Sequence, residues 1–279
     1  FELNAAGEMT TEYDDAEIGN VSATYGVEFG DGRGHFMVHG DFTDRAEVRY
    51  PDRDFAAYWN RDVYDENGQP TGYRDWYNSG SVNSAIFDPF LNWYGHFNGD
   101  GQLQPFDSQT YGFVTPNHFD LQVPQEREIL FSKVRWSADA FELFGQVHLA
   151  KVSSTRPMPP PVVFDMFFMP IQGNPFLSPQ DQMTIGMTPA PQFLGQDFDG
   201  DGIANIGPVG IGRWFLDLGE TKWEIENEML QVNLGFTADL TDSWGLEGRV
   251  SHGSVDYDAQ IGPGVVIANL QQAVMVNPF

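Results

Sequence analysis

The chain has 279 residues, with 14 Lys and Arg against 40 Asp and Glu, and therefore a formal net charge of −26. It contains no cysteine, which excludes disulfide scaffolds, thiolate metal sites and thiol catalysis. The acidic excess argues against a nucleic-acid partner, because binding of phosphates requires clustered Lys and Arg. The 14% aromatic content nevertheless predicts a folded chain, and 30 Gly and 18 Pro favour strands and loops over helices.

The first clear element is a β-hairpin between residues 20 and 43. Apolar and polar residues alternate along 20–30, and the turn 30–34 (GDGRG) supplies glycines for positive φ angles. The alternation then returns through Phe36, Val38 and Phe42. A period of two residues predicts strands with one apolar and one polar face.

A long loop is expected next, from about residue 45 to 126. It contains aromatic residues among many Asp, Asn and Gly, and flat rings beside hydrogen-bonding groups suit sugars or siderophore chelates. The candidate ligand-binding residues are Trp59, Tyr73, Trp76, Tyr77, Trp93 and Tyr94. The alternative is that these rings pack the loop on itself.

A second hairpin is predicted from residue 127 to 149, and a second long loop from about 152 to 222. This loop contains the run DFDGDGIAN at 197–205. Carboxylates at alternate positions followed by Gly wrap a hard cation, so a structural Ca²⁺ is expected at Asp197, Asp199, Asp201 and Asn205. A complete EF-hand is excluded, because Pro208 stands where the bidentate Glu belongs, and the alternative is a solvated turn.

A third hairpin is predicted from residue 228 to 250, with its turn at Thr241-Asp242-Ser243. The turns inside all three hairpins are short, whereas the connections between hairpins are far longer than ordinary ones. Antiparallel pairing would place every short turn at one end of the sheet and every long loop at the other. Transmembrane β-barrels have this asymmetry, with short periplasmic turns and long extracellular loops.

Five segments carry a family resemblance: 25–34 (YGVEFGDGRG), 40–45 (GDFTDR), 121–127 (LQVPQER), 173–176 (GNPF) and 223–240 followed by WGLE at 244–247. In their order and separation they resemble the barrel domain of TonB-dependent outer-membrane receptors of the proteobacterial type. The resemblance implies a Gram-negative outer membrane and TonB-energised uptake of a scarce ligand, foremost a ferric siderophore and otherwise a carbohydrate. It implies no catalysis and no required cofactor.

This chain departs from the family pattern in two respects. Its plug domain, which contacts the TonB complex, is not visible in residues 1–279, and family barrels have 22 strands around a plugged lumen. The fold class expected is therefore all-β, as a partial antiparallel transmembrane β-barrel with six clear strands, surrounded by outer-membrane lipid. The competing class is a secreted, calcium-stabilised β-sandwich that binds glycans. A glycan-cleaving enzyme would use paired carboxylates, but these are too numerous in this chain to be diagnostic, so this third hypothesis has no positive support.

Overall fold

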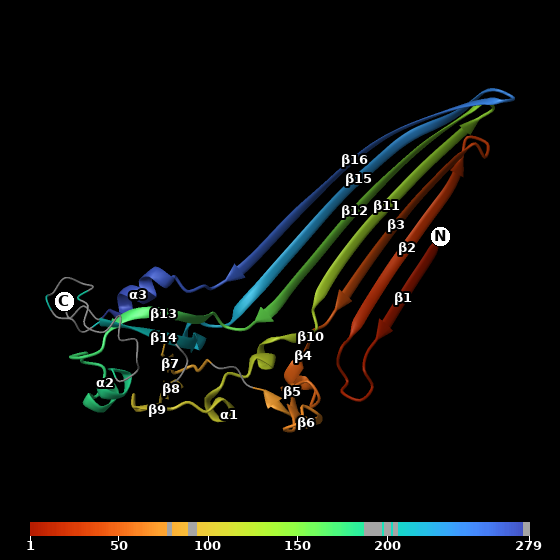
Figure 1. The fold of residues 1–279 in the computed structure, drawn as a ribbon. Coiled ribbons are helices and arrows are strands. Elements are labelled where there is room, and N and C mark those ends of the chain that lie inside the picture. Colours follow the sequence, from red (N-terminus) through yellow and green to blue (C-terminus); the bar gives the residue numbers. More distant parts are fainter. Residues whose placement is uncertain (77–79, 89–93, 187–196, 198–201, 203–205, 276–279) are drawn as a thin grey trace. The chain divides into compact units, whose positions relative to one another are not determined.

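The fold is known from a computed structural model of the chain, which describes all residues except 77–79, 89–93, 187–196, 198–201, 203–205 and 276–279 (Figure 1). It divides into two compact units. Unit 1 comprises Phe1–Arg49, Asp120–Pro157 and Lys222–Ile261, and unit 2 comprises Tyr50–Phe119, Met158–Thr221 and Gly262–Phe279. The two long connections predicted between hairpins supply nearly all of unit 2.

Unit 1 is a sheet of seven strands in the order β1-β2-β3-β11-β12-β15-β16 (Figure 1). The bounds of its strands are β1 Glu2–Glu8, β2 Ile18–Phe29, β3 Gly34–Arg45, β11 Gln125–Ala138, β12 Phe141–Met158, β15 Thr221–Thr241 and β16 Trp244–Gly262. The three predicted hairpins are confirmed as β2–β3, β11–β12 and β15–β16. The short strand β1, which pairs with β2, was not predicted, because its Ala5-Ala6-Gly7 run gives little alternation.

The register of the strands confirms that the short turns and the first long connection lie at opposite ends of the sheet. Phe29 pairs with Gly34 and Ala138 with Phe141, so the short turns lie at one end of the sheet. Arg45 pairs with both Ile18 and Gln125, which places the entry and exit of the first long connection at the other end. A short ladder between β4 (Val48–Arg49) and β10 (Asp120–Gln122) extends this end.

Four glycines in the sheets lie beneath a phenylalanine ring. Gly34 lies under Phe29, Gly235 under Phe144, Gly248 under Phe236 and Gly210 under Phe87, and a Cβ added at any of them would collide with the ring. A ring that covers a glycine on the neighbouring strand compensates for the missing side chain and fixes the register of the pair.

Unit 2 contains a five-stranded antiparallel sheet in the order β13-β14-β7-β8-β9 and a separate hairpin, β5–β6. The strand bounds are β5 Trp59–Tyr64, β6 Pro70–Trp76, β7 Ala85–Phe87, β8 Tyr94–Phe97, β9 Leu103–Pro105, β13 Val162–Pro170 and β14 Ile206–Trp214. The helices are η1 Tyr50–Asp52, α1 Ser108–Tyr111, η2 Thr115–His118, α2 Pro179–Gly186, η3 Leu216–Leu218 and α3 Ile267–Val274.

A hydrophobic core holds unit 2 together. Phe167, Ile185 and Val209 are at most 2% exposed and pack with Ile86 and Ile211 in one cluster. The edge of β13 is closed by α3, where the Gln271 amide donates to the Phe168 carbonyl at 2.7 Å and accepts from the Phe168 N–H at 3.1 Å. The segments expected as loops therefore form a folded unit with a core of their own.

The prediction of an all-β, antiparallel fold is confirmed. The sheet of unit 1 is open, with β1 and β16 at its edges, and the described residues form no closed barrel. Among the described helices, none has the length and hydropathy needed to span a bilayer.

Candidate functional site

One face of the seven-stranded sheet is divided into two zones, and we call it the zoned face. Directly paired residues share a face of a sheet, so the registers of β2, β3, β11 and β12 define it. For β15 the face is fixed by Leu234, whose side chain lies against the Cβ position of Gly145, and for β16 by Gly248 under Phe236. The half nearest the short turns is apolar and the half nearest the long connections is acidic.

The apolar zone consists of large side chains that are exposed, from 37% for Phe236 to 72% for Trp244. It covers 21–29 on β2, 34–42 on β3, 130–138 on β11, 141–149 on β12, 230–240 on β15 and 244–250 on β16. Its exposed members are Val21, Tyr25, Val27, Phe29, Phe42, Leu130, Val134, Phe141, Leu143, Leu149, Leu234, Phe236, Leu240, Trp244, Leu246 and Val250. A soluble monomer rarely exposes so large an apolar patch.

The line at which the acidic zone begins crosses β3, β11 and β12 at nearly the same height. Leu130 pairs with Leu149 as the last apolar pair, and the next pair on the same face is Glu128 with Lys151. Beyond that line the face carries Asp44, Glu126, Glu224, Glu226, Asp256 and Asp258. The change of chemistry occurs at the same height on β11 and β12 and one pair further along on β3, where Phe42 pairs with Glu128.

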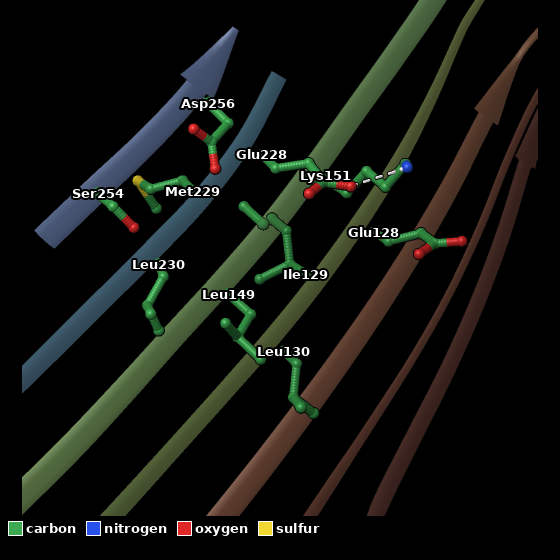
Figure 2. A pocket seen from close by; sticks show the side chains of 11 residues that line it. Glu128, Ile129, Leu130, Leu149, Lys151, Glu228, Met229, Leu230, Ser254 and Asp256 are labelled. Atoms are coloured by element: carbon green, nitrogen blue, oxygen red, sulfur yellow. Dashed lines mark hydrogen bonds and ion pairs between the residues drawn. The ribbon is translucent and has the colours of Figure 1, made fainter. Parts of the chain in front are cut away.

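A pocket of about 550 Å³ lies on this border (Figure 2). Leu130, Leu149 and Leu230 line its apolar side, and Glu128, Lys151 and Glu228 line its charged side. The Lys151 ammonium donates to Glu228 and forms an ion pair with Glu226, each at 2.9 Å, and so joins β12 to β15. This arrangement can hold an amphiphile, with hydrocarbon on the leucines and a polar head at the charges.

The opposite face of the sheet is polar and carries a hydrogen-bond network near its long-connection end. The Asn20 amide donates to Asp41 at 2.7 Å and to Thr43 at 2.8 Å, and Arg127 pairs with Asp41 at 3.2 Å. Further along, Ser251 donates to the buried Asn233 at 2.6 Å. Side chains of this kind suit contact with water.

The six predicted ligand-binding aromatics are spread over different elements. Trp59 and Trp76 are paired residues of the β5–β6 hairpin, Tyr73 belongs to the same hairpin, and Tyr94 lies in β8 of the five-stranded sheet. The Trp59 ring stacks on Phe119 with centroids 6.2 Å apart. Tyr77 and Trp93 lie outside the described residues. Ligand binding by this set remains a prediction.

The calcium prediction falls mainly on residues 198–201 and 203–205, which are outside the described part of the chain. Of its ligands only Asp197 is described, and its carboxylate accepts a hydrogen bond of 2.8 Å from the Gly202 N–H, where φ is +83°. The described residues contain no cluster of three or more His, Asp or Glu with metal-binding geometry. Calcium binding thus also remains a prediction.

The residues of the border pocket were missed by sequence reasoning, although a signal for them exists. Glu224, Glu226 and Glu228 have the same parity as Leu230 and Leu234, so one strand face changes from acidic to apolar within β15. The prediction stopped at residue 228, where the alternation of apolar residues ends.

A buried histidine in unit 2 predicts a dependence of stability on pH. His96 is 1% exposed, and its ring lies 3.7 Å from that of Tyr111 and 6.1 Å from that of Phe106. Burial lowers the pKa of His96, and the backbone of Pro105 offsets this only in part. Protonation therefore favours the unfolded state, where the pKa is about 6.5.

We expect the free energy of unfolding of unit 2 to be unaffected by His96 above about pH 6.5 and to fall as the pH decreases below it. Urea unfolding at pH 7.5 and 5.5 measures this, with the non-titrating His96→Phe as the comparison. The loss between the two pH values should be smaller in His96→Phe, and an equal loss in both proteins would contradict the assignment to this histidine.

Compared with known proteins, the sequence matches no family model, no curated protein and no solved structure.

Proposed function

We propose that the chain forms part of the wall of an outer-membrane β-barrel receptor, with its zoned face toward lipid and its polar face toward a hydrated lumen. The observation that carries this proposal is the similar length of the apolar zone on β2, β3, β11, β12 and β15. On most strands it spans about 9–11 residues measured from the short turns, which is the length a tilted strand needs to cross a bilayer.

The zoning of the face supports a membrane over a second protein layer. A sandwich core would extend along the whole length of the strands, whereas here Glu128 and Lys151 follow directly on Leu130 and Leu149. A bilayer has the same boundary, where hydrocarbon gives way to polar headgroups. The border pocket lies at the height where headgroups would be.

The edges of the sheet also fit a piece of barrel wall. Unpaired N–H and C=O groups at β1 and β16 cannot face hydrocarbon, because each unsatisfied group costs several kcal/mol there. Further strands would have to pair with both edges. In this arrangement the two long connections that build unit 2 emerge on the extracellular side, where they can capture ligand.

The TonB-energised uptake step and the ferric siderophore are proposed from the family resemblance at 25–34, 40–45 and 121–127. They would give the barrel a direction of transport, into the cell, and a ligand to carry. No catalytic role is proposed.

Nitroxide labels on β11 test the membrane placement, and the absence of native cysteine makes each label unique. The variants are Val134→Cys in the apolar zone, Lys133→Cys on the polar face and Glu126→Cys in the acidic zone, all at exposed positions. In lipid vesicles we expect the Val134 label to collide with oxygen and to be shielded from a water-soluble nickel chelate. The Lys133 and Glu126 labels should be accessible to nickel.

Two outcomes would contradict the proposal. A Val134 label that is immobile and shielded from both reagents would place the apolar zone against protein, as in a β-sandwich. A Val134 label as accessible to nickel as the Lys133 label would place it in water.

A further inference from the structure

Unit 2 contains a second pocket, of about 350 Å³, built from three segments. These are residues 81–83, the helix α1 and the turn η2 with the residues that join them. The volume is at the small end of the roughly 300–1,000 Å³ typical of ligand sites.

The backbone around the pocket is fixed by hydrogen bonds. Ser81 exchanges two of them with β14, donating to the Gly212 carbonyl and accepting from the Trp214 N–H, each at 3.2 Å. Phe113 donates to the Gly80 carbonyl at 3.1 Å. The walls are thereby held in place before any ligand arrives, which reduces the entropy cost of binding.

The aromatic walls are fixed as well. The Phe113 ring, 7% exposed, stacks between His118 at 4.9 Å and Trp214 at 4.3 Å, both tilted by 15°. The Tyr111 ring, 40% exposed, packs on the buried His96. Tyr111 thus offers exposed ring surface on a rigid support.

Three polar side chains of the pocket form no side-chain hydrogen bond within the described part of the chain, whereas the Ser81 and Thr110 hydroxyls are already hydrogen-bonded. The Asn83 and Asn117 amides and the Tyr111 hydroxyl form no side-chain hydrogen bond among the described residues, and both asparagines are exposed. Of the residues that the structure describes, no Asp, Glu, Lys or Arg lines the pocket, in a chain with a net charge of −26. The site offers aromatic surface and neutral hydrogen-bonding groups in combination.

We infer that this pocket binds a neutral sugar ring, with the apolar face of the sugar on Tyr111 and its hydroxyls on Asn83 and Asn117. A sugar supplies both kinds of contact, since its C–H groups pack on aromatic rings and its hydroxyls pair with amides. An anionic chelate would find no Lys or Arg among the described residues that line the pocket, and a purely apolar ligand would leave the amides unpaired. The site is thus distinct from siderophore capture, and it rests on unit 2 alone.

The test is calorimetric titration of the full chain with a panel of neutral sugars (glucose, galactose, mannose, N-acetylglucosamine and their disaccharides) and with glucuronate and glucosamine as charged counterparts. An amine-oxide detergent is required, because glycoside detergents would compete for the site. We expect at least one neutral sugar to bind with millimolar or better affinity, and its charged counterpart to bind at least about tenfold more weakly.

Variants locate the binding. Asn83→Ala and Asn117→Ala should each weaken it by roughly 2- to 10-fold, and Tyr111→Ala by about tenfold or more. Asn269→Ala on α3 and Tyr64→Phe in the β5–β6 hairpin are matched controls outside the pocket, and should leave affinity unchanged.

Three results would overturn the inference: no neutral sugar of the panel binding, charged sugars binding equally well, or binding that the pocket variants leave intact. None of them bears on the position of β11 in the membrane, so failure here is distinguishable from failure of the barrel proposal.

Discussion

Replacing Leu234 by arginine is expected to lower the free energy of unfolding of the bilayer-inserted protein by about 2–4 kcal/mol. Leu234 lies near the middle of the apolar zone on β15 and is 57% exposed. At this height the guanidinium would have to enter hydrocarbon, where it finds neither water nor a counter-ion. The measurement is a denaturant titration in lipid vesicles, followed by tryptophan fluorescence.

Two companion variants separate the effect of depth from that of charge. Thr237→Arg places the same charge on the polar face of the same strand, and it should cost less than about 1 kcal/mol if, as proposed, this face lines a hydrated lumen. Leu230→Arg places it at the border, next to Glu228, and it should also cost about 0–1 kcal/mol. Equal losses at Leu234, Leu230 and Thr237 would contradict a bilayer on the zoned face.

The strands of unit 1 can be predicted well from the sequence, because the pattern that marks each strand lies within a short stretch of the chain. Alternation at 20–30 and 230–240, with turns such as Thr241-Asp242-Ser243, needs only neighbouring residues to be recognised. Strand ends were less accurate. β12 continues to Met158 and β15 begins at Thr221, where charged residues replace apolar ones although the backbone pairing persists.

Unit 2 and its pocket could not be predicted in the same way. Its five-stranded sheet pairs β7 with β14, residues far apart in the chain, and β7 is only three residues long, too short to give a periodic signal. The sugar-sized pocket depends on the same long-range pairing, since Ser81 is held by β14. Aromatic content pointed to the first long connection as a binding region, but not to Tyr111 and Phe113.

The second large effect on stability is expected when the Phe167 side chain is truncated. Phe167 lies in the middle of β13, is 1% exposed and belongs to the core cluster with Ile185 and Val209. Phe167→Ala should destabilise unit 2 by about 3–5 kcal/mol, through lost apolar burial and the cavity left behind. Phe168→Ala is the matched control on the same strand, because its ring is 40% exposed, and it should cost far less.

Hydrogen exchange followed by mass spectrometry locates the effect of Phe167→Ala. Backbone amides of β13 and β14 should exchange faster by two to three orders of magnitude or more, since their opening free energy falls with the stability of unit 2. Amides of β11 and β12 should keep their protection, because unit 1 is held by its own strand pairing. Equal loss of protection in β11 would mean that the two units unfold as one cooperative body. The two units would then be separate in structure but would not unfold independently. The sugar pocket would in that case lose its rigid frame only when the sheet unfolds as well.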